Sequence, residues 1–365
     1  MSILLAIIFA VLLFSILIFV HEWGHFIAAK LSGVQVNEFA IFMGPAIAKW
    51  TKGETKYSIR CIPLGGYCAM EGEDGDSDNP RAFYKAAWWK RLIILVAGSF
   101  MNFVIGVVIV AVVLFCQPNY VVPEITQIDS GSALLCEQGL QVGDTILELD
   151  GQKISVYEDF SLATLMLPDG EYDMVVLRNG QKLKLENVPM IRSVPDATDS
   201  NTLLYGISFS VRETTAASVP GRILPTAMNH VKTVLVSLKM LLTGQAGVQD
   251  MTGPVGIVGM MSETASASKT TGLALVNLLW FGGFIAINLG VMNLLPIPAL
   301  DGGRFIIPRD TEIIMVMVPK FRMVSAKLSA ESMASPICSP MATGPPTASK
   351  PYLPLKVSIK ESTVI

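Results

Sequence analysis

Three long runs of apolar residues stand out along the chain, and polar stretches separate them. Residues 3–20 carry no charge, residues 92–116 follow the basic pair Lys90 and Arg91, and residues 273–300 contain glycines and prolines in their later half. A helix rises about 1.5 Å per residue, so about 20 apolar residues cross a hydrocarbon core about 30 Å thick. The pattern therefore predicts a polytopic α-helical membrane protein with three spans.

The first apolar run has an alternative interpretation as a cleaved signal peptide. Such a peptide opens with basic residues and ends in a small-residue cleavage site. Here Met1 and Ser2 carry no basic charge, and the run leads directly into His21 and Glu22. We therefore expect a retained helix. The third run is expected to line a site, because glycine and proline persist at membrane depth where neighbours or a cavity satisfy the freed backbone.

The distribution of Lys and Arg predicts the orientation, because basic residues are enriched in cytosolic loops. Nine Lys and Arg lie within residues 21–91, whereas residues 117–152 contain none. The first loop is then cytosolic and residues 117–270 are extracytosolic. The ends of the first and third runs consequently fall on the same side of the membrane.

The composition agrees with a membrane protein. Hydrophobic residues make up 51% of the chain and charged residues 16%, which is below the roughly 25% of soluble domains. The net charge of −3 argues against a nucleic acid partner, which requires a concentrated basic face. The five cysteines form no CxxC pair, which disfavours a disulfide framework or a thiolate zinc site.

The first run ends in the sequence HEWGH, from His21 to His25, which fits the motif H-E-x-x-H. On a helix, residues i and i+4 share one face, so both imidazoles can bind one Zn²⁺, and Glu22 can act as general base toward a water molecule that the metal activates. The alternative is a chance match among polar residues at a helix end. Polar groups at the edge of a span are costly unless they have a function, which favours the metal site.

A catalytic zinc usually has three protein ligands and one open position. His230 is the third histidine of the chain, but the charge distribution places it on the outer side, where we interpret it as a solvent or interface residue on an amphipathic helix. Asp301 is the better candidate, because it stands at the cytosolic end of the third run. Its alternative role is to mark the end of that helix by hydrogen bonding in a turn.

The combination of HEWGH with NLLPIPALDGG at 293–303 resembles the site-2 protease family of intramembrane zinc metalloproteases, and more closely the bacterial regulator-of-sigma-E protease group. The segments 42–45, 53–74, 79–83 and 97–103 (FMGP, GETKYSIRCIPLGGYCAMEGED, NPRAF and AGSFMNF) are similar to that group as well. The resemblance implies that His21, His25 and Asp301 are zinc ligands and that Glu22 is the base. It covers residues 1 to about 305.

The resemblance also implies that residues 38–70 form a β-hairpin loop that dips toward the membrane beside the site. Residues 55–62 alternate in part, and Gly65 and Gly66 can make a sharp turn. The alternative is a cytosolic surface hairpin. Cys61 and Cys68 flank the expected turn, and we interpret them as packing residues.

Residues 117–192 are expected to form an inserted extracytosolic β-rich domain. Strand-like runs include 121–128 and 172–178, and the latter precedes an Asn-Gly hairpin signal at Asn179. Residues 130–154 resemble a bacterial PDZ domain, whose groove takes an extended peptide along a sheet edge. The resemblance implies that this domain excludes substrates with bulky outer domains or senses cut peptide ends. The alternative is a structural β-domain that binds nothing.

These features divide the chain into five predicted regions. They are an N-terminal membrane region, the PDZ-like domain, a connector with an amphipathic helix at 222–243, a C-terminal membrane region, and a tail, at 1–116, 117–192, 193–270, 271–305 and 306–365. The amphipathic helix lies on the outer surface or in the core of the outer module. The family continues after residue 305 into a fourth span. Here the sequence instead suggests a disordered tail and a shifted frame or truncation near residue 306, which would loosen Asp301.

The function that the resemblance implies is intramembrane proteolysis in the bacterial cell membrane. The substrates would be single-span proteins such as anti-sigma factors, together with remnant signal peptides. A spanning substrate helix must be unwound before attack, and the side chain of Asn293 either holds the substrate backbone or caps a broken half-helix. The alternative function is a membrane-anchored PDZ adaptor with an impaired metal site. A zinc transporter is disfavoured, because three spans offer no polar path.

Overall fold

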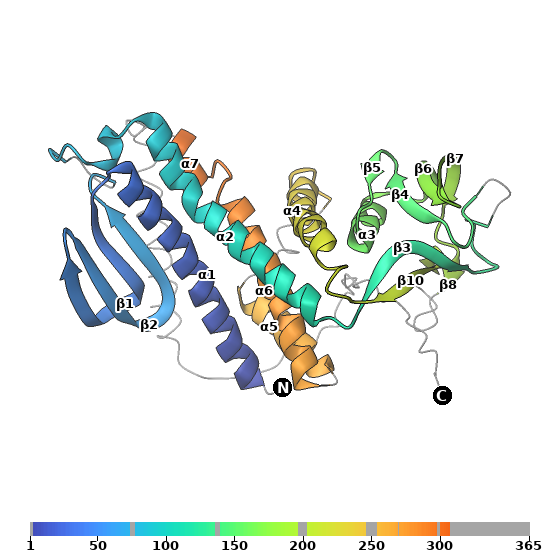
Figure 1. Ribbon diagram of the computed structural model, residues 1–365, viewed down its shortest axis with the longest axis horizontal. Helices are drawn as coiled ribbons and strands as arrows, with labels where there is room; N and C mark the ends of the chain where they lie inside the picture. Colours follow the sequence, from blue (N-terminus) through green and yellow to red (C-terminus); the bar gives the residue numbers. More distant parts are fainter. Residues whose placement is uncertain are drawn as a thin grey trace, which may run out of the picture. The chain divides into compact units, whose positions relative to one another are not determined.

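The computed structural model describes residues 3–73, 77–135, 139–195, 203–245, 254–268, 270–297 and 300–306. Three of its helices are long and apolar enough to cross a membrane: α1 (Ile3–Ser32), α2 (Trp88–Cys116) and α6 (Thr271–Met292). Figure 1 shows these helices side by side. The three apolar runs therefore form helices as predicted. The expectations for the tail beyond residue 306 lie outside the described residues.

Two helix ends differ from the prediction. Helix α1 continues to Ser32, so HEWGH lies inside the helix rather than at its end. Helix α6 stops at Met292, and a short helix α7 (Asp301–Ile306) begins after the proline-containing segment. A proline lacks the N–H that would continue the helical ladder, and it disfavours helical backbone in the preceding residue. The alternative role of Asp301, marking the end of the third apolar helix, is therefore wrong, since Asp301 begins α7.

Glycines let the three helices approach closely. A Cβ atom on Gly106 of α2 would lie 2.6 Å from Ile287 Cγ1 of α6, and one on Gly282 of α6 would lie 2.9 Å from Leu13 Cδ1 of α1. Small residues at such crossings are typical of helices that associate in lipid, where packing replaces the hydrophobic effect. The close packing gives the buried polar side chains of these helices fixed neighbours.

Strands β1 (Val36–Lys52) and β2 (Thr55–Met70) form the expected hairpin, packed against α1 (Figure 1). One turn lies at Gly53, where Lys52 pairs with Thr55, and the chain reverses again between residues 59 and 66, where Gly65 has positive φ, in agreement with the turn predicted at Gly65 and Gly66. Residues 38–41 pair with 66–69 and also with 56–59, so the hairpin curls into a small sheet.

A hydrogen bond ties the hairpin to the first membrane helix. Ser15 Oγ donates to the carbonyl oxygen of Pro63 at 2.6 Å. Ser15 lies six residues before His21 on α1, which is about 9 Å along the helix. The hairpin therefore contacts α1 well inside its apolar stretch.

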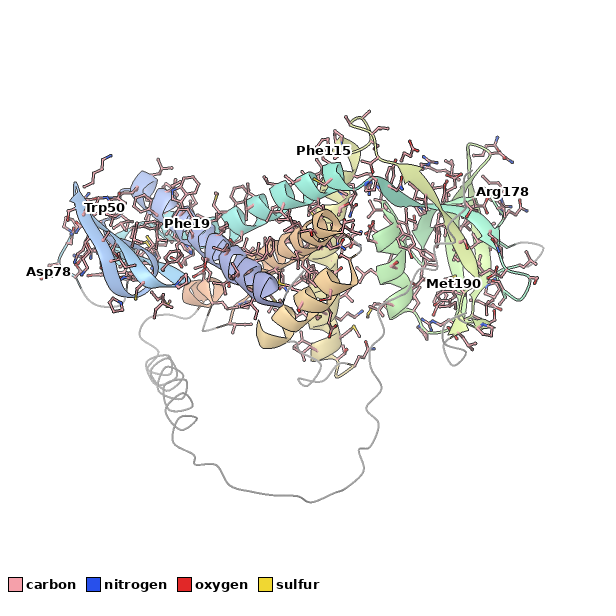
Figure 2. The ribbon with its side chains drawn as sticks, turned by 90° about the horizontal axis from the view of Figure 1, so that it is seen from below. Phe19, Trp50, Asp78, Phe115, Arg178 and Met190 are labelled. Carbon is pink, nitrogen blue, oxygen red and sulfur yellow. The ribbon has the colours of Figure 1, made fainter. Side chains whose placement is uncertain are left out.

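The β-rich module is built around one antiparallel sheet with the strand order β10-β3-β4-β6-β7. Its elements in chain order are β3 (Asn119–Ile128), β4 (Thr145–Leu149), β5 (Gln152–Lys153), α3 (Tyr157–Met166), β6 (Gly170–Arg178), β7 (Gln181–Met190), β8 (Val194–Pro195), β9 (Leu203–Leu204) and β10 (Ile207–Glu213). Asn179 and Gly180 make the β6–β7 turn, both with positive φ, as predicted. Figure 2 labels Arg178 and Met190 on these two strands. Because β10 pairs with β3, the sheet extends past the predicted boundary at residue 192.

Helix α4 (Pro220–Leu242) contains the predicted amphipathic segment, and α5 (Pro254–Ala267) follows it. The apolar face of α4 packs with residues of α2 and α6. Helix α4 is therefore neither a lone surface helix nor a core helix of the β-rich module. His230 is buried against Trp280 at 5.0 Å between ring centroids, and burial lowers its pKa to about 4. The suggestion that His230 faces solvent is therefore wrong, whereas its placement at an interface is right.

Candidate metal centre

Three side chains from the two ends of the described chain meet beside α1. His21 Nε2 lies 3.0 Å from Asp301 Oδ2, His25 Nε2 lies 3.3 Å from the same oxygen, and the two Nε2 atoms are 3.2 Å apart. Zinc bonds of about 2.0–2.1 Å in tetrahedral geometry place neighbouring ligand atoms about 3.3 Å apart. The spacing of these three atoms therefore fits one zinc ion, and a fourth position remains for water or substrate.

The far side of the His25 ring supports the same conclusion. His25 Nδ1 lies 2.7 Å from the backbone carbonyl oxygen of Ile94. A carbonyl oxygen only accepts hydrogen bonds, so Nδ1 carries the proton and Nε2 presents its lone pair toward Asp301. Metal-binding histidines usually donate their other ring N–H in this way.

The three residues between the two histidines of HEWGH have different surroundings. Glu22 Oε2 accepts a hydrogen bond of 3.0 Å from the backbone N–H of Cys68 in β2, so the hairpin holds this carboxylate. Trp23, in contrast, is 41% exposed. A Cβ on Gly24 would lie 2.5 Å from the carbonyl oxygen of Ala97, so glycine is needed where α1 meets α2.

Helix α2 leaves room for the two imidazoles at Gly98. A Cβ on this residue would lie 2.4 Å from His25 Nε2 and 2.8 Å from His21 Cε1. Both rings consequently occupy the space that any larger side chain would fill. Asn102, one helical turn later and almost fully buried, places Nδ2 3.2 Å from His21 Nδ1.

Asp301 reaches the histidines because α7 folds back on the end of α6. The backbone N–H of Gly302 donates to the carbonyl oxygen of Asn293 at 2.9 Å. A Cβ on Gly302 would lie 2.4 Å from the carbonyl oxygen of Leu294, so the glycine permits this close return. Asn293 is the C-cap residue of α6, and its side chain is half-buried.

The structure brings together three of the residues singled out from the sequence, His21, His25 and Asp301, with Glu22 beside them. His230 is absent from the metal-competent cluster found in the described part of the chain. Sequence reasoning did not identify Gly98 and Asn102 as functional residues. The sequence feature that could have identified them is the segment 97–103, which we used only as part of the family resemblance.

An H-E-x-x-H motif on a helix with a distant carboxylate as third donor is typical of zinc metallopeptidases. The family model described as Peptidase family M50 matches residues 9–320, and the chain belongs to this family. It is accordingly a zinc metallopeptidase within a scaffold of apolar helices.

Named relatives agree with this assignment. A Clostridium acetobutylicum protein with a provisional zinc-metalloprotease name is 38% identical, covering 81% of this chain and 84% of its own length. The regulator of sigma-W protease RasP of Bacillus subtilis is 29% identical, covering 81% of this chain and 87% of its own. The zinc metalloprotease RasP of Bacillus licheniformis is 28% identical, covering 81% and 88%.

Proposed function

We propose that this chain is an intramembrane zinc endopeptidase that cuts the spanning segments of single-span membrane proteins. His21, His25 and Asp301 hold the zinc ion, and Glu22 is the general base. The observation that carries the proposal is the convergence of His21 and Asp301, 280 residues apart in sequence, on a 3.0 Å contact among apolar helices. A cation bound among these three side chains offsets the repulsion between their converging lone pairs.

The reaction needs one proton carrier beside the metal. When bound, Zn²⁺ polarises the scissile carbonyl and makes hydroxide available near neutral pH. Glu22 takes the proton of the attacking water and passes it to the leaving nitrogen. The N–H of Cys68 orients one carboxylate oxygen of Glu22, so the hairpin β1–β2 sets the direction of proton transfer.

The substrate helix must present an unwound segment, because every peptide carbonyl of an intact helix is bonded within its own ladder. Backbone groups of β2 near Cys68 lie beside Glu22 and can pair with the unwound segment by strand addition. The side chain of Asn293 holds the substrate backbone at the break between α6 and α7. Unwinding and cleavage then occur at one place.

The substrates that we propose are single-span regulators such as anti-sigma factors, since the Bacillus subtilis relative is named a regulator of sigma-W protease. The chain would lie as a multi-pass protein in the bacterial cell membrane, with the segment between α1 and α2 on the cytosolic side. The β-rich module would be a PDZ-like domain on the outer side that binds an extended peptide. A PDZ adaptor without catalysis is the competing function, and cleavage assays separate the two.

The deciding experiment compares Glu22→Gln with the unchanged chain on a reporter membrane helix in detergent. We expect Glu22→Gln to retain zinc and to cleave at least about 100-fold more slowly, because proton transfer is lost. Glu54→Gln is a matched control, because Glu54 pairs with Lys30 and Arg81 away from the metal ligands. Undiminished cleavage by Glu22→Gln, or a zinc-loaded wild-type chain without activity, contradicts the proposal.

A further inference from the structure

One face of α2 supports both imidazoles from behind. Ile94, Gly98 and Asn102 follow one another at intervals of four residues, so they lie on the same face of the helix. The carbonyl of Ile94 fixes the proton of His25 on Nδ1. Gly98 leaves space for the rings, and Asn102 meets His21 Nδ1 at 3.2 Å.

The amide of Asn102 has one atom without a partner. Asn102 is 1% exposed, and its Oδ1 is buried with no hydrogen bond among the described residues. Leaving a buried acceptor unpaired costs about 1–3 kcal/mol. The two ends of an amide are nearly equal in size, so exchanging Oδ1 and Nδ2 moves no other atom; Oδ1 then faces His21 Nδ1, and Nδ2 takes the position without a partner.

The tautomer of His21 decides between the two amide orientations. If Nδ2 donates to His21 Nδ1, the ring proton of a neutral His21 must sit on Nε2, the atom that faces Asp301 and His25. A metal on Nε2 requires the proton on Nδ1 instead. The partner of Nδ1 must then be an acceptor, and Oδ1 is the acceptor that Asn102 offers.

We propose that Asn102 is a positioning residue for the metal centre: its Oδ1 accepts the Nδ1 proton of His21 and so directs the Nε2 lone pair to zinc. Asn102 does for His21 what the Ile94 carbonyl does for His25. This inference rests on the proposed zinc site. Residues of α2 then fix the orientation of both imidazole rings, while Asp301 reaches the metal centre from α7.

The test measures zinc affinity of the full-length chain in detergent by chelator competition, together with the absorption spectrum of the Co²⁺-loaded protein. Asn102→Leu keeps the volume and removes the acceptor, and we expect zinc binding about 10–100-fold weaker. Asn102→Asp keeps an acceptor, and we expect wild-type affinity or tighter binding. Asn277→Leu on α6 is the matched control, because Asn277 bonds to Ser268, and its affinity should not change.

Two results overturn the inference without touching the proposed function. One is wild-type zinc affinity and Co²⁺ spectrum in Asn102→Leu. The other is an equal loss in Asn102→Leu and Asn102→Asp, which would mean that Asn102 only fills space. If the unchanged chain and a His21→Ala variant are equally unable to bind zinc, the proposed metal site itself is wrong. Circular dichroism of each variant verifies that the helices are formed.

Discussion

Two aspartates, the buried Asp144 in the β-rich module and the half-buried Asp301 beside α1, show how differently the same side chain is used. Asp144 is 0% exposed, accepts hydrogen bonds of 2.8 and 2.7 Å from Arg178, and accepts a third from the N–H of Gln141. Asp301 instead faces the Nε2 atoms of His21 and His25. Donors surround the first carboxylate, whereas the second joins other lone pairs.

The difference separates a structural carboxylate from a ligand. The charge of Asp144 is compensated by Arg178 on β6 within the module. His25 carries its proton on Nδ1, so its Nε2 offers Asp301 no donor when the ring is neutral. Acceptor atoms that converge without protons between them repel one another, and a bound cation turns this repulsion into attraction.

The largest effect on folding should come from breaking the compensated pair. Asp144→Asn removes the charge opposite Arg178, and we expect the β-rich module to lose about 3 kcal/mol of stability, at the low end for broken buried pairs because Arg178 is partly exposed. Hydrogen exchange of the module checks the loss. Zinc affinity should stay unchanged, and a drop in zinc binding would contradict the separation of the two roles.

The next effect concerns the space for the imidazoles. Gly98→Ala places a Cβ within 2.4 Å of His25 Nε2, and we expect zinc binding about 100-fold weaker, equivalent to roughly 2.7 kcal/mol. Gly106→Ala, on the same helix, meets Ile287 instead and should lower stability while leaving zinc affinity intact. Normal zinc binding by Gly98→Ala would show that the ligands are not held as described.

The smallest effect concerns Asp159, whose carboxylate accepts hydrogen bonds from Lys232 and Asn229 of α4 and from the N–H of Ser155. Burial alone would raise the pKa of Asp159, but these hydrogen bonds outweigh it and lower the pKa. The stabilisation is therefore complete above about pH 4 and is lost as the pH falls through the folded-state pKa. We expect Asp159→Asn to cost about 1–3 kcal/mol at neutral pH.

Unfolding curves of Asp159→Asn and the unchanged chain at neutral and acidic pH test this prediction. The difference in unfolding free energy should shrink on acidification. A difference that is equal at both pH values would mean that the charge of Asp159 contributes nothing to the contact with α4.

The sequence predicted the metal centre better than its surroundings. H-E-x-x-H is a local pattern, and helical spacing alone puts His21 and His25 on one face. Asp301 was found because the charge distribution placed the two run ends on one side. Asn102 and Gly98 were missed as functional residues, because their roles depend on the rotational register of α2 against α1, which hydrophobic periodicity does not determine.

The errors in the fold have similar causes. The sequence predicted one turn in the hairpin, at Gly65 and Gly66, whereas the chain also turns at Gly53, because partial alternation does not show how many times a glycine-containing segment reverses. The third run remained apolar to residue 300, so hydropathy could not place the end of α6 at Met292. The partner of β3 lies some 80 residues later in β10, and a strand pairing of that range leaves no local signal.

The most direct test of the central claim is the zinc content of the purified full-length chain. The chain is exposed to excess zinc, unbound metal is removed, and the bound zinc is measured by inductively coupled plasma mass spectrometry. We predict one zinc ion per wild-type chain, close to none in Asp301→Ala, and one in His230→Ala, since His230 packs against Trp280 away from the metal cluster. Equal zinc content in the wild-type chain and Asp301→Ala would contradict the account.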